Sequence, residues 1–174
     1  MPPVGAVDGE QSYRIGIGDL LQIEVYDEPD LTKEVRVLTD GYISFPLLGS
    51  LKAAGLTVKG FEDEITTLLG AKYLVSPQVT VFVKEYSNVF IFGEVKQPGS
   101  FPLYGRMTVF EAITLAGGLT EVANASKIKV IRQETGGQEL SYELDLNKLT
   151  KHGDTSEDLE LQANDRVIVP RSFF

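Results

Sequence analysis

Several short stretches of the chain alternate between apolar and polar residues, which is the period of a strand with one buried face. Turn-forming residues precede some of these stretches, as at Gly18-Asp19 and at the hairpin-like turn Thr39-Asp40-Gly41. The predicted strands occupy residues 21–25, 35–37, 42–46, 79–83, 89–92, 101–104, 128–131, 140–144 and 167–169. Pro102 favours an edge position for its strand, because proline cannot donate to a ladder.

Two other segments have the period of an amphipathic helix. Thr57 can cap the first helix, whose expected apolar face consists of Val58, Phe61, Ile65, Leu68 and Leu69. Thr108 and Glu111 form a capping box at the start of the second helix, and Gly117-Gly118 ends it. Strands with one helix in each half predict an α+β fold of two small mixed domains.

The chain divides into a tail and two units of similar size. Residues 1–12 are rich in Pro, Gly and acidic residues without periodicity, so they predict a flexible tail. Residues 13–87 and 88–174 each supply strands and a helix and are predicted as separate domains. Asp19 and Asp165 each stand just before an alternating strand. This echo fits either a common local solution or a divergent pair of related units.

The charge of the chain argues against nucleic acid as a partner. Its 174 residues include 16 scattered Lys and Arg against 25 Asp and Glu, a net charge of −9, whereas phosphate binding needs clustered cations.

There is no cysteine, which excludes disulfides and thiolate metal sites without fixing the compartment. The opening residues 1–5 lack the basic and apolar regions of a signal peptide. We therefore expect either a cytosolic protein or one whose leader has been removed.

The sequence carries no motif for catalysis, for a cofactor or for a metal, so no residue is predicted in those roles. His152 lies in a polar, loop-like stretch and has no Cys or second His with which to bind zinc. Gly16-x-Gly18 has Leu21 where a dinucleotide loop needs its third glycine, and it leads into a strand rather than a helix. A carbohydrate-active enzyme, which needs two carboxylates at a defined separation, is an alternative that the sequence leaves open.

Recognition of a ligand would fall to the tyrosines and phenylalanines, because the chain has no Trp, seven Tyr and nine Phe. Most of the phenylalanines lie within strand or helix patterns and are expected in the core. Tyr104 and Arg106, in the loop before the second helix, are the expected exposed recognition pair. Together with Lys96 and Gln97 they are the predicted contacts to a glycan or to a neighbouring subunit of a ring.

Ordered motifs run through both units. Those of the first unit are Tyr13-x-Ile15-Gly16-x-Gly18-Asp19-x-Leu21-x-Ile23-x-Val25, Thr39 to Gly49, Gly55-Leu56-Thr57 and Tyr73 to Val79. This set resembles the opening of the bacterial polysaccharide biosynthesis/export family. Those of the second unit are Val89 to Val95, Pro98-Gly99, Leu103, Thr108, Ala112 to Leu119, Asp145-Leu146 and Asn164-Asp165-x-Val167-x-Val169-Pro170. They resemble a soluble-ligand-binding β-grasp domain.

The resemblance implies a polysaccharide-export domain followed by a β-grasp-like domain in a protein without catalytic activity. It implies a homo-oligomeric periplasmic ring or channel component, through which capsular polysaccharide or exopolysaccharide crosses the outer membrane. Implied partners are the polysaccharide, an inner-membrane chain-length regulator or tyrosine kinase, and a separate outer-membrane pore protein. The alternative is a periplasmic glycan-binding module that passes the polymer to a partner channel.

Three departures from the family pattern shape these expectations. The signal sequence and lipidated cysteine are missing, as expected of a trimmed outer-membrane lipoprotein. Asn164 replaces a usual glycine, and Asn also accepts left-handed turn geometry. The chain ends without the further domain and amphipathic helix of the long members. It therefore resembles the short class of the family, and we expect another protein to cross the membrane.

Overall fold

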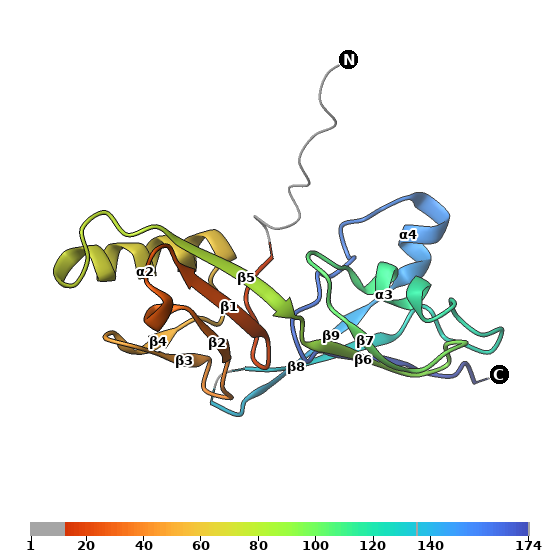
Figure 1. The fold of residues 1–174 in the computed structure, drawn as a ribbon. Coiled ribbons are helices and arrows are strands. Elements are labelled where there is room, and N and C mark those ends of the chain that lie inside the picture. The colour runs from red at the N-terminus through yellow and green to blue at the C-terminus, as the bar shows by residue number, and fades with distance from the viewer. Residues whose placement is uncertain (1–12, 135, 174) are drawn as a thin grey trace, which may run out of the picture. The chain divides into compact units, whose positions relative to one another are not determined.

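The computed structural model of the protein describes residues 13–134 and 136–173, and the chain divides into two compact units, residues 1–87 and 88–174 (Figure 1). Each unit combines strands with helices, which confirms the predicted α+β class. The predicted tail, residues 1–12, lies outside the described residues. None of the helices in the described part of the chain is both long and apolar enough to cross a membrane.

The first unit holds a three-stranded antiparallel sheet, a separate hairpin and one long helix. Its elements are β1 (Leu20–Val25), η1 (Pro29–Leu31), β2 (Lys33–Arg36), β3 (Tyr42–Phe45), β4 (Gly49–Lys52), α2 (Val58–Lys72) and β5 (Val79–Glu85). The sheet has the order β2-β1-β5, while β3 pairs only with β4. The sequence did not predict β4, and the turn at Thr39-Asp40-Gly41 does not join two strands of one ladder. Leu47 and Gly49 turn the chain back with positive φ angles instead.

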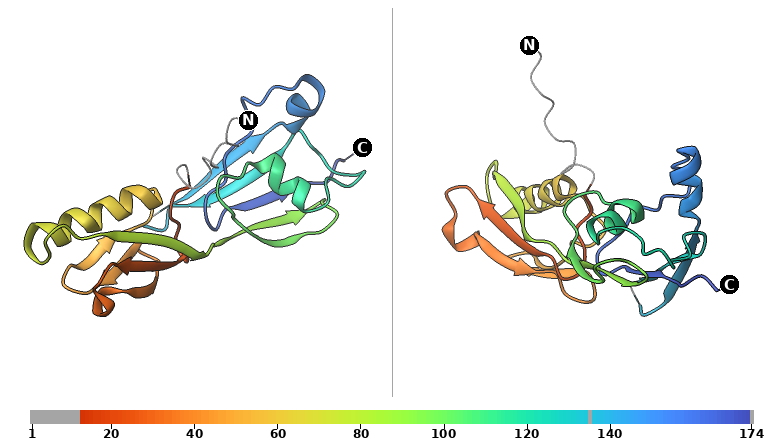
Figure 2. Two further views of the ribbon diagram at one scale, coloured as in Figure 1. Left: turned by 45° about the horizontal axis from the view of Figure 1, so that its top comes forward. Right: turned by 90° about the vertical axis from the view of Figure 1, so that its right-hand side faces the viewer.

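Helix α2 begins and packs largely as its sequence predicts. The Thr57 side chain accepts a hydrogen bond from the Gly60 amide at 3.0 Å, and the helix buries Phe61, Ile65 and Leu69. Leu68 was expected on this face but is 38% exposed, because the buried positions follow a strict four-residue spacing that leaves it to one side. Figure 2 shows α2 lying alongside β5, with which it makes extensive contacts.

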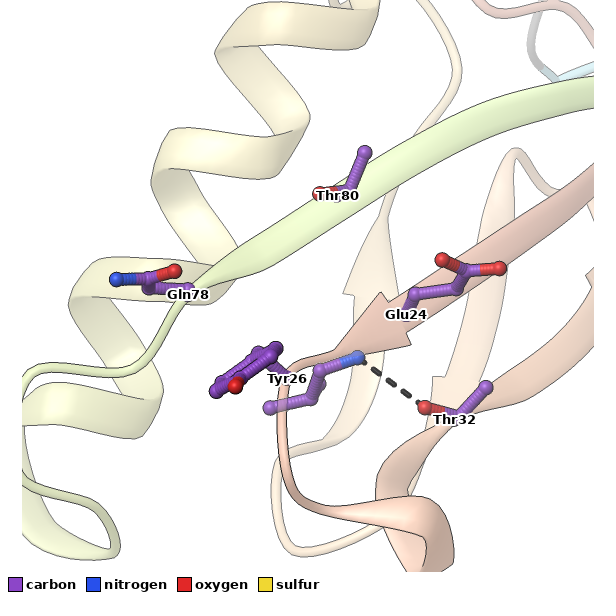
Figure 3. A pocket seen from close by; sticks show the side chains of 6 residues that line it. Glu24, Tyr26, Thr32, Gln78 and Thr80 are labelled. Carbon is purple, nitrogen blue, oxygen red and sulfur yellow. Dashed lines mark hydrogen bonds between the residues drawn. The ribbon is translucent and has the colours of Figure 1, made fainter.

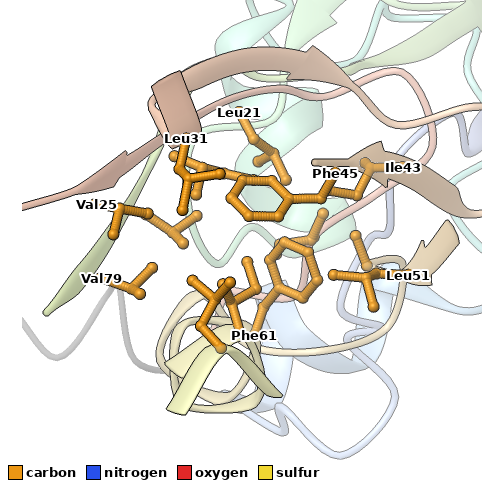
Figure 4. Close-up of a cluster of buried hydrophobic side chains, with 14 of the residues drawn as sticks. Leu21, Val25, Leu31, Ile43, Phe45, Leu51, Phe61 and Val79 are labelled. Atoms are coloured by element: carbon orange, nitrogen blue, oxygen red, sulfur yellow. The ribbon is translucent and has the colours of Figure 1, made fainter. Parts of the chain in front are cut away.

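The core of the first unit lies between α2, the hairpin and one face of the sheet. Phe45 of β3 and Phe61 of α2 lie near its centre (Figure 4). The alternating strand β1 directs Leu21, Ile23 and Val25 inward and leaves the residues between them on the opposite face. This arrangement means that the outward face of the β2-β1-β5 sheet is free of α2 and the hairpin.

The second unit is a five-stranded mixed sheet with helices. Its elements are β6 (Asn88–Gly93), β7 (Gly99–Pro102), α3 (Val109–Leu115), β8 (Ile128–Gln133), β9 (Glu139–Leu144), α4 (Leu146–His152) and β10 (Arg166–Val169). The strand order is β7-β6-β10-β8-β9, with β10 parallel to β6 and every other pair antiparallel. Two hairpins joined through a helix, with the last strand inserted between them, form the β-grasp arrangement. Pro102 lies on the edge strand β7, as predicted.

The capping of α3 confirms the sequence prediction. The Thr108 hydroxyl accepts from the Glu111 amide, and the Glu111 carboxylate accepts from the Thr108 amide. Gly117 and Gly118 then end the helix in left-handed conformations. The sequence did not predict α4. His152 was expected in a loop, but it is the last residue of α4, which Asp145 caps by accepting from the Asn147 amide.

Candidate functional site

The four predicted contact residues lie at two ends of α3. The amides of Lys96 and Gln97 donate to the carbonyls of Gly118 and Ala116, just past the end of the helix. Tyr104 and Arg106 instead precede the start of α3. Because a seven-residue helix is about 10 Å long, the structure does not bring the two pairs together in one site. All four side chains are exposed, Tyr104 by 66%.

Arg106 is part of an ion pair on the surface of the second unit. Its Nε donates to the Glu160 carboxylate at 2.8 Å, and both side chains are substantially exposed. The backbone holds the two segments together here, since the Leu161 amide donates to the Met107 carbonyl at 2.8 Å. Exposed pairs of this kind are worth at most about 1 kcal/mol, so Arg106 remains able to exchange Glu160 for another acceptor.

Asp19 is the most heavily engaged polar side chain of the first unit. It is fully buried, and one carboxylate oxygen accepts from the Tyr13 hydroxyl at 2.5 Å and the Gly16 amide at 2.8 Å. The other oxygen accepts from the Ser87 amide at 2.7 Å and from its hydroxyl at 2.6 Å. Four donors therefore hold a carboxylate that burial alone would strongly disfavour.

Tyr13 shares this buried environment. Its ring packs edge-on against Tyr86 at 4.9 Å between centroids. Burial raises the pKa of the Tyr13 hydroxyl far above its ordinary value, and the negative charge and hydrogen bond of Asp19 raise it further. The hydroxyl therefore stays protonated and donates to Asp19 throughout the neutral pH range.

Asp165 has the corresponding place in the second unit, with a charged partner. It is fully buried, and Arg132 Nη2 donates to it at 2.7 Å while Nε donates at 3.0 Å. Arg132 also donates to the Glu160 carbonyl and lies over the Tyr142 ring at 5.3 Å. Burial disfavours the charged guanidinium, but the hydrogen bonds and negative charge of Asp165 outweigh that effect, so the pKa of Arg132 is raised.

The two aspartates lie in turns of the same type, one in each unit. Asp19 and Asp165 each accept, at 2.8 Å, a side-chain hydrogen bond from the amide three residues earlier, and each is preceded by a residue with positive φ. Because both carboxylates are fully buried and saturated with donors, they cannot reach a substrate. They anchor strands β1 and β10 and are structural groups.

The outward face of the β2-β1-β5 sheet has a different character. Tyr26, next to the end of β1, is 78% exposed, and Phe82 of β5 is 49% exposed. A shallow pocket of about 260 Å³ lies at the Tyr26 end of this face. Its lining is formed by Glu24, Val25, Tyr26, Thr32, Gln78 and Thr80 (Figure 3). The pocket thus has an aromatic ring, a carboxylate, an amide and hydroxyl groups within a small area.

The exposed aromatic residues correct the expectation that most phenylalanines lie in the core. Among the phenylalanines that the structure describes, only Phe45 and Phe61 are buried, whereas Phe82, Phe92, Phe110 and Phe173 are exposed. Sequence reasoning therefore overlooked Tyr26 and Phe82. A signal was present, since Val79, Val81 and Val83 point one way in β5 and an aromatic residue between them must point outward.

Within residues 13–134 and 136–173, no group of three or more His, Asp or Glu side chains is placed to hold a metal ion.

The α+β unit of residues 1–87 is followed by the β-grasp unit of residues 88–174, and this order can be compared with known families. In this comparison, residues 7–84 match the family of polysaccharide biosynthesis/export proteins, and residues 87–169 match the SLBB domain. The chain belongs to the polysaccharide biosynthesis/export family.

The names of individual relatives also refer to polysaccharide export or exopolysaccharide production. The chain is 33% identical over 90% of its length to the EPS I polysaccharide export outer membrane protein EpsA of Ralstonia nicotianae, covering 47% of that protein. It is 35% identical over 69% of its length to EpsA of Ralstonia solanacearum, covering 39%. It is 29% identical over 66% of its length to the exopolysaccharide production protein ExoF of Rhizobium meliloti, covering 30%. The chain spans less than half the length of these curated relatives.

Proposed function

We propose that the protein is a non-catalytic component of the apparatus that exports capsular polysaccharide or exopolysaccharide across the outer membrane. The observation that carries this proposal is the ordered match of both units to the polysaccharide-export family and its SLBB domain. The names of the EpsA relatives support the same role and an outer-membrane context.

The two buried aspartates are unsuited to acid–base catalysis. A general acid or base must reach a proton of its substrate, and Asp19 and Asp165 have no exposed surface. Each is committed to donors within its own unit. A carbohydrate-active enzyme would need a pair of accessible carboxylates across a cleft.

The setting that fits this role is the periplasmic side of the outer membrane. There the protein would form a homo-oligomeric ring. Its further partners would be the polysaccharide, an inner-membrane chain-length regulator or tyrosine kinase, and a separate outer-membrane pore protein. Lys96, Gln97, Tyr104 and Arg106 are the proposed contacts to the polymer or to a neighbouring copy, since all four are exposed on the second unit.

Deletion of the gene tests the export role. We expect polysaccharide in the medium to fall at least tenfold in the deletion strain and to return when the wild-type protein is supplied. Growth rate and total cell protein serve as controls for general damage. Unchanged release of polysaccharide from the deletion strain would overturn the proposal.

The ring is tested separately by size measurement of the protein extracted from membranes. Light scattering is expected to give one discrete oligomer well above the monomer mass. A monomer at every concentration would remove the ring from the proposal while leaving the export role in place.

A second candidate function is a monomeric glycan-binding module that hands the polymer to a partner channel. The exposed ring of Tyr104 beside the exchangeable Arg106–Glu160 pair favours it. Titration with the polysaccharide of the source cells is then expected to show binding that weakens in Tyr104→Ala and Arg106→Ala. Unaltered binding in both variants would exclude these residues as the contact.

A further inference from the structure

The outward face of the first sheet places two exposed aromatic rings on either side of a polar strip. The register pairs Gln22 with Phe82 and Glu24 with Thr80, and the Tyr26 amide donates to the Gln78 carbonyl at 2.9 Å. We propose that this face binds uncharged pyranose units of the exported polysaccharide. The proposal rests on the export function above and assigns that function a polymer-contact surface in the first unit.

Each set of side chains directly opposite one another across β1 and β5 forms a row on this face. The spacing between the rows suits a chain of sugars rather than one small molecule. Rows two residues apart on a strand are separated by about 6.8 Å, so the Tyr26 and Phe82 rows lie about 14 Å apart. Side chains directly opposite one another are only about 5 Å apart at Cβ, so each row is a continuous contact. Two rings bracketing a strip of this length can contact successive residues of an extended polymer.

The side-chain chemistry matches both aspects of a pyranose. The rings of Tyr26 and Phe82 offer flat apolar surfaces for the C–H face of a sugar, with exposures of 78% and 49%. Gln22 lies opposite Phe82 and Gln78 beside Tyr26, and the amides of both can donate and accept. Between the two rings, the Glu24 carboxylate accepts and the Thr80 hydroxyl does both. Hydroxyl groups around a sugar ring need this mixture of donors and acceptors.

The charged groups beside this face favour uncharged sugars. Lys84 is paired with Glu34 and Arg36 with Glu85, both at 2.9 Å. Each of these cations is therefore accompanied by a carboxylate, so the two pairs add no net positive charge that could attract an acidic polymer. The Glu24 carboxylate would in addition repel an acidic sugar while accepting from neutral hydroxyl groups.

A second exposed sheet face provides an internal contrast. In the second unit, Phe92 is 45% exposed and lies opposite Ile168, with Phe90 stacked beside it at 6.5 Å between ring centroids. This pair has neighbours of a different kind, because the register places Arg166 opposite Phe90 and Ile168 opposite Phe92. Phe92 is therefore a control for Phe82, similar in exposure but placed on an inner strand and beside different neighbours.

The experiment is an NMR titration of the full chain, labelled with ¹⁵N. The probe is a set of oligosaccharide fragments from the exopolysaccharide of the cells that encode the protein, with oligogalacturonate as an acidic comparator. We expect the side-chain amide signals of Gln22 and Gln78 to shift with the fragments and to respond less to oligogalacturonate. Affinity should fall about five- to tenfold in Tyr26→Ala and in Phe82→Ala and stay unchanged in Phe92→Ala.

The outcomes separate this inference from the export function. Unshifted Gln22 and Gln78 signals at saturating fragment concentration would overturn the inference, as would an equal loss of affinity in Phe92→Ala. A loss confined to Tyr104→Ala would move the contact to the second unit and equally overturn it. Because wild-type complementation of the gene deletion is measured independently, release of polysaccharide can confirm the export role even when the sugar site fails.

Discussion

Each unit has a buried aspartate in the same type of turn, but the side chains that donate hydrogen bonds to the two carboxylates differ in charge. Asp19 immediately precedes β1 and Asp165 immediately precedes β10, and each carboxylate accepts a hydrogen bond from the amide three residues before it. In the first unit the remaining donors are the uncharged hydroxyl of Tyr13 and the amide and hydroxyl of Ser87. In the second unit the Arg132 guanidinium donates in their place.

This difference affects how much stability each unit should lose when one hydrogen-bond partner of its aspartate is removed. A buried carboxylate held by neutral donors loses one hydrogen bond when one donor is removed. A buried ion pair that loses one partner leaves an uncompensated charge, which is far more costly. The anchor of the second unit should therefore be the more fragile of the two. Each anchor also fixes one side of the unit boundary, Ser87 through Asp19 and Asn88 through the Asn164 amide.

The largest effect is expected from removing the charged partner of Asp165. Arg132→Ala should lower the free energy of unfolding of the second unit by about 3–5 kcal/mol, because Asp165 is then buried without a cation. The measurement is urea unfolding combined with amide exchange in β8 and β10. Arg166→Ala, which removes an exposed pair with Glu139, is the control and should cost at most about 1 kcal/mol. Equal losses in the two variants would contradict the account.

Asparagine at each aspartate compares the two anchors directly. Asp19→Asn should cost about 1–3 kcal/mol, because each carboxylate oxygen receives a backbone amide and an Asn nitrogen would face one of them. Asp165→Asn should cost about 3–5 kcal/mol, since it leaves Arg132 buried without its countercharge. Circular dichroism during urea unfolding measures both. A larger loss at Asp19 would reverse the comparison.

Tyr13→Phe should lower the free energy of unfolding of the first unit by about 1.5 kcal/mol at pH 8, because the lost hydroxyl donates a hydrogen bond to a charged group. The folded state holds the pKa of Tyr13 above its unfolded value, so its contribution is complete below about pH 10 and is lost as the pH rises further. Above pH 10 the wild type should lose about 1.4 kcal/mol per pH unit that the variant does not lose. Parallel pH profiles for the two proteins would show that Tyr13 ionises freely in the fold.

The last comparison concerns the residue with positive φ that precedes each aspartate, and its smallest expected effect is at Asn164. Gly18→Ala should cost about 1–2 kcal/mol, because φ is +91° and the new Cβ would lie 3.3 Å from the Ser87 hydroxyl. Asn164→Gly should change stability by no more than about 1 kcal/mol, since both residues adopt the φ of +68°. Thermal unfolding is sufficient to compare them. A gain from Gly18→Ala would show that the turn at Asp19 can relax.

The local part of these anchors could be predicted from the sequence. Gly18-Asp19 and Asn164-Asp165 were recognisable as turns before strands, because a left-handed residue followed by an aspartate is a local signal. Their partners could not be predicted, because Ser87 and Arg132 are 68 and 33 residues away. Arg132 nevertheless gave a hint, as a charged residue in the inward series Ile128, Val130, Arg132 of β8.

The secondary-structure elements and the candidate contact residues likewise separate into local features, which could be predicted, and long-range features, which could not. Helices α2 and α3 were predicted because Thr57, Thr108 and Glu111 accept hydrogen bonds from amides three residues away. The strand β4 lacks an alternating apolar run, having Leu51 as its only large apolar residue, and its pairing with β3 was not visible. Exposure of Tyr26 and Phe82 depends on which face of the sheet α2 covers, which is a tertiary property.

Cell fractionation of the deletion strain tests the central claim of polysaccharide export most directly. The quantity measured is the polysaccharide outside the cell relative to that retained in the periplasm, with and without the wild-type gene. The account predicts that deletion moves polymer from the outside to the periplasmic fraction and that the wild-type gene reverses the change. An unchanged ratio between the two fractions would contradict it.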